Sequence, residues 1–356
     1  MTAQARIAVV GAGWWATTVH IPALMINPNA DLVAICDPYP ARAQSAAAEA
    51  GAHGYTDVTE MLAAEGLDGV IIATPHSTHY AIAAEALKAG VNVLVEKPLA
   101  TSASDAWELV TLAADRGLLL SAGLTYHYAA QAPAIRDAVR HEIGELRSVN
   151  AEFSSSTGDF FVVVDENSAN PNDPKAPHAT TYSDPSTGGG QAHTQLTHLL
   201  GGLLWAAGEQ ATHVAAMTEN HGLRVDLVDS FSFRLEGGAL CVASSTGTTP
   251  PGVPPRHRIR FHGTKGMVEW DLLKAQADVF LEGGIVRQLE NPDHLPAYGR
   301  ERVSESFVNS IQTNAPTPAP GAFAAASVSL IEAALFAAES GKTITVPQAP
   351  FDIREN

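Results

Sequence analysis

Cysteine and positive charge are both scarce in this chain. Its 356 residues include two cysteines, Cys36 and Cys241, and Cys36 lies inside an apolar run. This usage indicates buried thiols in a reducing compartment rather than a disulfide framework. Lys and Arg together number 21 against 38 Asp and Glu, which gives a formal net charge of -17. We therefore expect neither nucleic acid nor an anionic membrane as a partner, because both are bound chiefly through clustered Lys and Arg.

Long apolar runs are lacking as well. No stretch approaches the roughly eighteen unbroken apolar residues of a membrane-spanning helix, and the first residues lack the layout of a secretory signal. We expect a cytoplasmic protein whose partner is a small molecule. A chain of this length exceeds what one hydrophobic core usually serves, so two domains are predicted.

A nucleotide-binding motif opens the chain. In "RIAVVGAGWWATTVHIPAL" an apolar run precedes Gly11 and Gly13, and Ala16 takes the third small position of a G-x-G-x-x-G/A turn between a strand and a helix. The next apolar run ends at Asp37, about twenty residues beyond the turn, where a carboxylate can accept hydrogen bonds from ribose hydroxyls. Asp37 favours NAD over NADP, because it would repel a 2'-phosphate, although Arg42 keeps NADP open.

Apolar runs continue to alternate with helical patterns as far as "LLLSAGLTY", residues 118–126, which is predicted to be a strand. Such alternation predicts a Rossmann-type doubly wound parallel sheet with helices on both faces, over residues 1–125. Ligands bind at the carboxyl ends of such strands. Besides Gly11, Gly13 and Asp37, the residues expected to line the cofactor are Trp14, Trp15, Thr74, Pro75, His76, His79, Glu96 and Lys97.

The chain resembles the Gfo/Idh/MocA family of NAD(P)-dependent oxidoreductases. The resemblance rests on blocks spread over nearly the whole sequence, in their order and spacing: "VVGAGWWA", "IIATPHSTHYAIAAEALKAGVNVLVEKPLA", "GELRSVNAEF", "GGGQAHTQLTH" and "HGTKGMVEWD". It implies that Lys97 lies beside the nicotinamide and contacts the reacting hydroxyl of a sugar or cyclitol. It also implies that His198, on the segment after the glycines, is the general base.

The glycine-rich stretch "TGGGQAHTQLTHLLGGLLW", Thr187 to Trp205, predicts a helix with one apolar face. At about 100° per residue, Thr194 and His198 lie opposite the leucines, and His193 lies at the edge of the apolar arc. A metal site is not expected, because His193 and His198 diverge and no Cys or carboxylate pattern accompanies them. A phosphate cradle is disfavoured too, because no Lys-Ser/Thr follows the glycines. The alternative for His198 is a structural histidine at the edge of the core.

Two departures from the family pattern bear on the chemistry. Thr194 stands where the family often has Asp, and a hydroxyl cannot carry the charge that stabilises an imidazolium. The base is then His198 assisted by Lys97, or Lys97 itself with a lowered pKa. Thr125 and His127 stand where the family frequently has Asn and Arg, so Tyr126 and His127 are candidate substrate contacts, with ordinary strand packing as the alternative.

Residues 126–356 read as an α+β domain with a large, mainly antiparallel open sheet, because several strands follow one another through short turns. A long polar loop before Gly188 is a candidate wall of the substrate pocket, with His178 and Tyr182 as contacts. The family resemblance implies that the outer face of this sheet is buried against another subunit, which predicts a homodimer or homotetramer.

Three functions are compatible with these features. The favoured one is NAD-dependent oxidation of a secondary hydroxyl of a sugar, sugar derivative or cyclitol. The second is an NAD-dependent glycoside hydrolase that oxidises its sugar transiently, using His193, His127 and Tyr126 for further acid-base steps. The third is a non-catalytic nucleotide-binding sensor, against which the presence of Lys97 and His198 argues.

Overall fold

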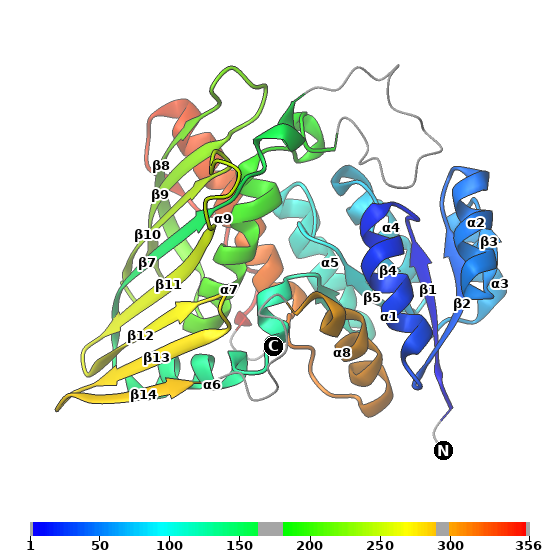
Figure 1. Cartoon of the computed structure of the whole chain (residues 1–356), viewed down its shortest axis with the longest axis horizontal. Helices are drawn as coiled ribbons and strands as arrows, with labels where there is room; N and C mark the ends of the chain where they lie inside the picture. The colour runs from blue at the N-terminus through cyan, green and yellow to red at the C-terminus, as the bar shows by residue number, and fades with distance from the viewer. Residues whose placement is uncertain (1–2, 163–180, 290–298, 354–356) are drawn as a thin grey trace. The chain divides into compact units, whose positions relative to one another are not determined.

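The computed structural model describes residues 3–162, 181–289 and 299–353, and the chain divides into two compact units (Figure 1). Of the described residues, the first unit takes 3–123, 181 and 300–321. The second takes 124–162, 182–289, 299 and 322–353. The first unit is thus completed by a segment from late in the chain. The division of the sequence into domains at 125/126 stays a prediction.

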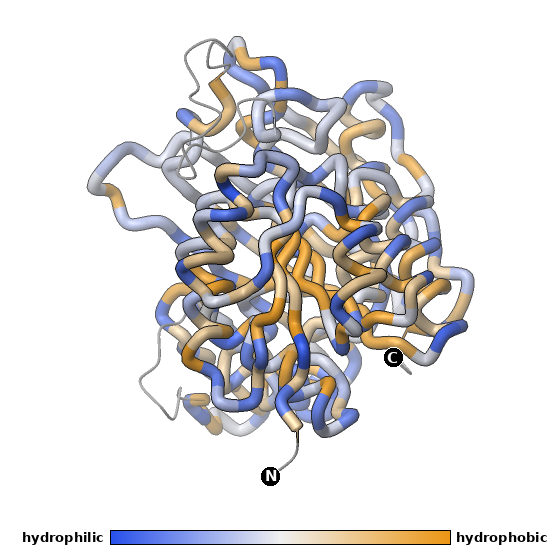
Figure 2. The backbone as a smooth tube through the Cα atoms, turned by 90° about the vertical axis from the view of Figure 1, so that its right-hand side faces the viewer, coloured by the Kyte–Doolittle hydropathy of each residue, from blue (hydrophilic) through white to orange (hydrophobic). Residues whose placement is uncertain are grey.

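The first unit is a parallel sheet of six strands in the order β3-β2-β1-β4-β5-β6. Its strands are β1 (Ala5–Val10), β2 (Ala30–Cys36), β3 (His53–Tyr55), β4 (Gly69–Ile72), β5 (Asn92–Val95) and β6 (Leu120–Ala122). Its helices are α1 (Ile21–Ile26), α2 (Pro40–Ala50), α3 (Val58–Glu65), α4 (His79–Lys88), α5 (Ala103–Arg116) and α8 (Arg300–Thr313). The central strands are hydrophobic along their length (Figure 2), as expected of strands covered on both faces.

The second unit holds a nine-stranded sheet in the order β14-β13-β12-β11-β7-β10-β9-β8-β15. All its neighbouring strands are antiparallel except β7 and β10. Its strands are β7 (Leu146–Ser154), β8 (Ala211–Glu219), β9 (Val228–Leu235), β10 (Leu240–Thr246), β11 (Arg256–Gly263), β12 (Gly266–Asp271), β13 (Gln276–Leu281), β14 (Ile285–Leu289) and β15 (Ile344–Thr345). The helices are α6 (Ala132–Asp137), α7 (Thr197–Ala207) and α9 (Gly321–Ser340). The predicted fold class is confirmed in both parts.

In the part of the chain that the structure describes, helices α6, α7 and α9 cover one face of the large sheet and no helix covers the other (Figure 1). Burial alternates along β9 and β10, so Phe231 and Phe233 lie in the core while Leu240 and Val242 are exposed on the outer face. Among the described helices, α9 alone has the length and composition of a membrane span, and 78% of its apolar window is buried inside the protein. It is placed as a core helix.

The strand predicted over residues 118–126 is wrong at its end. β6 stops at Ala122, and Thr125–Tyr128 form a 3₁₀ turn whose four residues are all buried. The local pattern is apolar enough for a strand, but the chain crosses into the second unit at this point, and the packing there favours the turn. Tyr126 and His127 therefore belong to a turn and not to a strand.

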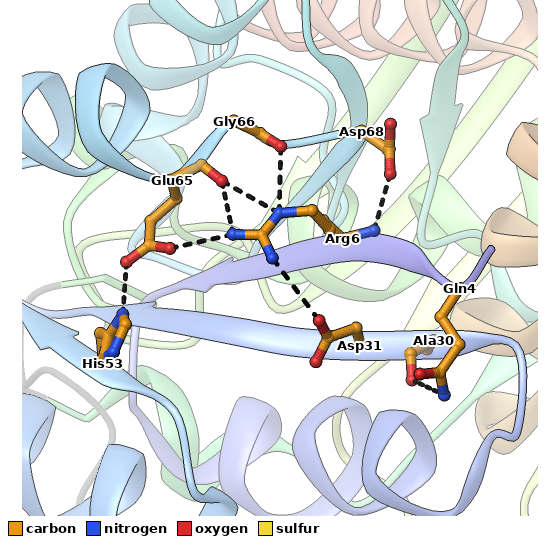
Figure 3. A network of polar contacts seen from close by, with 8 residues as sticks. All are labelled: Gln4, Arg6, Ala30, Asp31, His53, Glu65, Gly66 and Asp68. Atoms are coloured by element: carbon orange, nitrogen blue, oxygen red, sulfur yellow. Dashed lines mark hydrogen bonds and ion pairs between the residues drawn. The ribbon is translucent and has the colours of Figure 1, made fainter.

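Arg6, at the start of β1, joins three neighbouring segments (Figure 3). Its guanidinium donates to the carbonyl oxygens of Glu65 and Gly66 at 2.7 and 3.3 Å, and lies 3.3 Å from the Glu65 carboxylate. Asp31 on β2 forms a longer ion pair at 3.6 Å. The Glu65 carboxylate is also held by His53 and Tyr55, which keep its pKa below the usual value although burial opposes this. The network fixes the end of α3 against the sheet.

Replacing Arg6 by Ala should lower the free energy of unfolding by about 1–2 kcal/mol, because the nearly buried Glu65 carboxylate loses one of its donors and the carbonyls of Glu65 and Gly66 lose theirs. The measurement is urea denaturation followed by circular dichroism. Arg116→Ala is the matched control, since Arg116 is an exposed arginine of the same unit that donates one hydrogen bond, to the Lys88 carbonyl. An equal effect of the two substitutions would contradict the assignment.

Candidate active site

The turn after β1 has the geometry of a nucleotide cradle. Gly11 has φ +95°, and a Cβ there would stand 2.6 Å from the Ala73 carbonyl oxygen, so only glycine fits. A Cβ on Gly13 would meet nothing within 4 Å, which leaves its backbone approachable. Asp37 follows β2 and accepts hydrogen bonds from the backbone amides of Ala12 and Tyr39, both at 2.9 Å. The buried Asp37 carboxylate thus braces the turn, and these groups fit a dinucleotide.

The other predicted cofactor residues lie in this unit in different environments. Trp14 is 48% exposed, and Thr74 and Pro75 follow β4. His76 is buried, and its ring lies 5.8 Å from that of His79. His79 is fully buried, and its ring nitrogens face the carbonyl oxygens of Pro98 at 2.7 Å and Thr74 at 2.9 Å. His79 therefore ties the segments after β4 and β5 together, and its pKa is lowered by burial.

Glu96, at the end of β5, is a buried carboxylate with two side-chain donors at one of its oxygens. Oε1 receives hydrogen bonds from Trp15 Nε1 at 2.8 Å and lies 2.9 Å from His20 Nε2. The other ring nitrogen of His20 lies 2.8 Å from Ser304 Oγ on α8. Because Trp15 comes two residues after Gly13, this cluster attaches the glycine turn to β5. The sequence analysis did not identify His20 or Ser304 as partners of Glu96. His20 belongs to no motif with a characteristic spacing, and Ser304 lies 284 residues from His20 along the chain.

Lys97 follows Glu96 and is half-buried. Desolvation lowers the pKa of Lys97, and the charge of Glu96 opposes the shift. The Glu96 carboxylate has its own pKa held below the usual value by His20, Lys97 and Trp15, against the effect of burial. A lysine in this setting is easier to deprotonate than one in water, which suits a proton acceptor.

In the second unit, the glycine stretch leads into a helix that is not an ideal α-helix. Ala192–Leu196 form a π-helical turn that continues into α7, so the angles drawn from an α-helical wheel are wrong for His193 and Thr194. The leucine face is confirmed as core, since Leu196, Leu199, Leu200 and Leu203 are fully buried. His193, Thr194 and His198 are buried as well, so this helix has no solvated face over these residues.

Asp226 caps the start of this helix, and sequence reasoning missed it. Its carboxylate accepts from the Ala192 amide at 2.7 Å, and its carbonyl accepts from the Gln191 amide at 3.0 Å. A Cβ on Gly190 would overlap the Asp226 carboxylate, which explains the third glycine. Asp229 is buried beneath, accepts from Ser245 Oγ at 2.7 Å, and has its pKa raised well above the usual value by burial and by the Asp226 charge.

The remaining predicted contacts lie in three places. The Tyr126 ring meets the His198 ring edge-on, with centroids 5.9 Å apart. His127 packs 4.9 Å from the Trp205 ring, and burial lowers its pKa to about 4, so it is neutral. Tyr182 packs against a small apolar cluster of Phe161, Val225 and Leu227, while His178 lies outside the described residues. The structure thus brings Tyr126 to His198; Lys97 belongs to the other unit.

Comparison with known proteins gives a family match in each of the two units. The sequence model of an oxidoreductase family with an NAD-binding Rossmann fold, Gfo/Idh/MocA, matches residues 5–124, and that of the family's C-terminal domain matches residues 134–269. The chain belongs to the Gfo/Idh/MocA family. The resemblance read from the sequence is thereby confirmed, although the roles of individual residues stay predictions.

Two similar proteins bear the names of oxidoreductases of a sugar nucleotide and of a cyclitol. The chain is 35% identical over 150 residues to dTDP-3,4-didehydro-2,6-dideoxy-alpha-D-glucose 3-reductase of Streptomyces antibioticus, covering 42% of this chain and 46% of that protein. It is 33% identical over 161 residues to inositol 2-dehydrogenase of Arthrobacter sp. FB24, covering 44% and 48%. The matched part therefore spans about half the length of these relatives. The crystal structure of GenD2 from gentamicin A biosynthesis, in complex with NAD, shares the fold with a TM-score of 0.77, 24% identity and 98% coverage of both chains.

The two glycines of the turn should respond differently to the same substitution. Gly13→Ala should leave the melting temperature unchanged but weaken NADH binding by about tenfold, because the added methyl would occupy the space that the backbone needs to approach a pyrophosphate. Gly11→Ala should lower the melting temperature, because its Cβ would meet the Ala73 carbonyl. Differential scanning fluorimetry and NADH fluorescence titration measure the two effects. Unchanged NADH affinity in folded Gly13→Ala would contradict this placement.

The raised pKa of Asp229 predicts that the stability of the protein depends on pH. Its folded pKa lies above its unfolded one, so its contribution is present at low pH and is lost as the pH rises toward the folded pKa, with a slope of at most about 1.4 kcal/mol per pH unit. Asp229→Asn removes this titration. The melting temperature of the variant relative to the wild type should therefore rise as the pH increases above the unfolded pKa of Asp, about 3.9, toward the raised folded pKa. Asp115→Asn, on the exposed end of α5, is the control; a pH-independent difference for Asp229→Asn would refute the prediction.

Proposed function

We propose that the protein is an NAD-dependent oxidoreductase that oxidises a secondary hydroxyl of a sugar, sugar derivative or cyclitol, or reduces the corresponding ketone. One observation carries the proposal. Trp15, just after the glycine turn, and Lys97 both adjoin the Glu96 carboxylate, so a nucleotide cradle and a lysine of lowered pKa lie at the same edge of the sheet. The sugar and cyclitol oxidoreductases among the relatives support the substrate class.

Residues of the chain itself would accept the proton of the substrate hydroxyl. NAD, when bound, supplies the hydride acceptor. Lys97, easier to deprotonate than an exposed lysine, would bind the substrate hydroxyl and assist or replace the imidazole of His198 as the base. Thr194, at the position where the family often has Asp, cannot hold a charge, so proton transfer in this chain would depend more on Lys97. Lys97 and His198 are the proposed catalytic residues.

Cofactor preference and assembly follow as parts of the same proposal. Asp37, a buried carboxylate at the end of β2, favours NAD over NADP. The uncovered face of the large sheet carries Met217, Leu240 and Val242 in exposed positions, beside ion pairs such as Arg260 with Glu269. A second copy of the chain would bury this apolar surface, so we propose a homodimer or homotetramer.

The test is turnover of NAD or NADH with a panel of sugars, nucleotide sugars and inositols. Lys97→Ala and His198→Asn should each lower kcat/KM by about 10²- to 10⁴-fold, because a group that moves a proton in the transition state is lost. Lys88→Ala is the control, since Lys88 is an exposed lysine at the end of α4. NADH should form in proportion to oxidised sugar.

Two other outcomes would replace the proposal. Release of an aglycone without net NADH would identify a redox-neutral glycosidase. Tight NADH binding without turnover of any substrate in the panel, and with Lys97→Ala indistinguishable from the wild type in the cell, would identify a sensor.

A further inference from the structure

His257 is a buried histidine that neither the sequence motifs nor the proposed chemistry uses. It lies on β11, directly opposite Phe153 of β7, and its ring stacks on the Phe153 ring with centroids 3.7 Å apart and planes 16° apart. Its Nδ1 is hydrogen-bonded to the hydroxyl of Tyr126, and its Nε2 lies 3.2 Å from the carbonyl oxygen of Ser154. The side chain is therefore held at three points.

These contacts determine which nitrogen of His257 carries the hydrogen. Burial lowers the pKa of His257 to about 4, with the charge of Asp271 opposing the shift, so the ring is neutral at physiological pH. A carbonyl oxygen can only accept, so Nε2 carries the hydrogen and donates it to Ser154. Nδ1 is then an acceptor, and the Tyr126 hydroxyl donates to it. The hydrogen bond therefore runs from the Tyr126 hydroxyl to His257 and not the other way, and this fixes the orientation of the phenol ring.

Tyr126 lies between two histidines. Its ring meets His257 edge-on with centroids 5.9 Å apart, and it meets His198 in the same manner at 5.9 Å. Tyr126 is 1% exposed, and His198 is 3% exposed. A buried ring that is fixed at its hydroxyl end restricts the rotation of any ring packed against it. The orientation of the His198 imidazole therefore depends on a strand, β11, that is far from it in sequence.

We propose that Tyr126 and His257 act as one hydrogen-bonded pair that holds the imidazole of His198 in its working orientation. His257 is then a positioning residue that acts through Tyr126. The kinetic part of this inference rests on the proposed function, because it treats His198 as a proton acceptor. The structural part, that the pair restrains the His198 ring, stands apart from it.

Four substitutions separate the hydrogen bond from the ring packing. Tyr126→Phe keeps the ring and loses the hydroxyl. His257→Phe keeps an aromatic ring to stack on Phe153 and loses the acceptor, whereas His257→Asn keeps a polar group near the place of Nδ1 and loses the stack. Tyr128→Phe, a buried tyrosine of the same turn, is the matched control.

We expect Tyr126→Phe and His257→Phe each to lower kcat by about ten- to a hundredfold with KM nearly unchanged, because the base is misplaced rather than lost. The double variant should be no slower than either single variant, since both remove the same bond. His257→Asn should recover most of kcat, and Tyr128→Phe should match the wild type. Unchanged kcat in Tyr126→Phe and His257→Phe, additive losses, or full activity in His257→Phe with loss in His257→Asn would each overturn the proposal.

A second measurement does not depend on turnover. With ring-labelled histidine, the NMR signal of His198, assigned through His198→Asn, should shift and broaden in Tyr126→Phe and His257→Phe but not in Tyr128→Phe. If the wild type oxidises no sugar but these signals change as expected, the proposed function fails and the positioning pair stands. If turnover is found and the His198 signal is the same in every variant, the pair is refuted and the function stands.

Discussion

The first unit is organised around the buried carboxylate of Glu96. Removing a carboxylate from water is costly unless donors replace its hydration, and here Trp15 and His20 do so. These donors come from the turn and helix after β1, while Ser304 fixes His20 from α8. Gly123 is part of the same constraint, because a Cβ there would stand 2.6 Å from the Glu96 carboxylate. One charge thus joins the glycine turn, β5, β6 and a segment from late in the chain.

The second unit meets a similar requirement with a different pair of acids. Asp226 accepts the first free amides of the helix that carries His198, which is where a helix favours negative charge. Asp229 is close by and buried, and its burial together with the charge of the half-buried Asp226 favours the protonated form of Asp229. In each unit an acid holds backbone of the segment that carries a residue with a proposed chemical role: the buried Glu96 next to Lys97, and the half-buried Asp226 at the start of the helix that carries His198. Burying a carboxylate costs free energy, and the result is that the backbone next to it is held in one position.

The sequence was informative wherever the signal is local. The glycines and Asp37 follow a short pattern whose spacing reflects one strand, one turn and one helix, and the structure places them in that geometry. The parallel and antiparallel sheets were foreseen for the same reason, because apolar runs that alternate with helical patterns, and strands that follow one another through short turns, are both patterns of neighbours along the chain. The helix after Gly190 was foreseen, but its π-helical turn was not, and neither was Asp226, which binds the first amide of that turn from outside the segment.

By itself, then, the sequence determined the family, the class of each sheet, the glycine turn and the pairing of Glu96 with Lys97 in one motif. Only the tertiary structure decided what surrounds these groups: His20 and Ser304 at Glu96, Asp226 and Asp229 at the helix start, and His257 behind Tyr126. The reason is physical. Each partner is brought in by the fold from a distant part of the chain, and no local spacing records a hydrogen bond that spans 131 residues, as that of Tyr126 with His257 does.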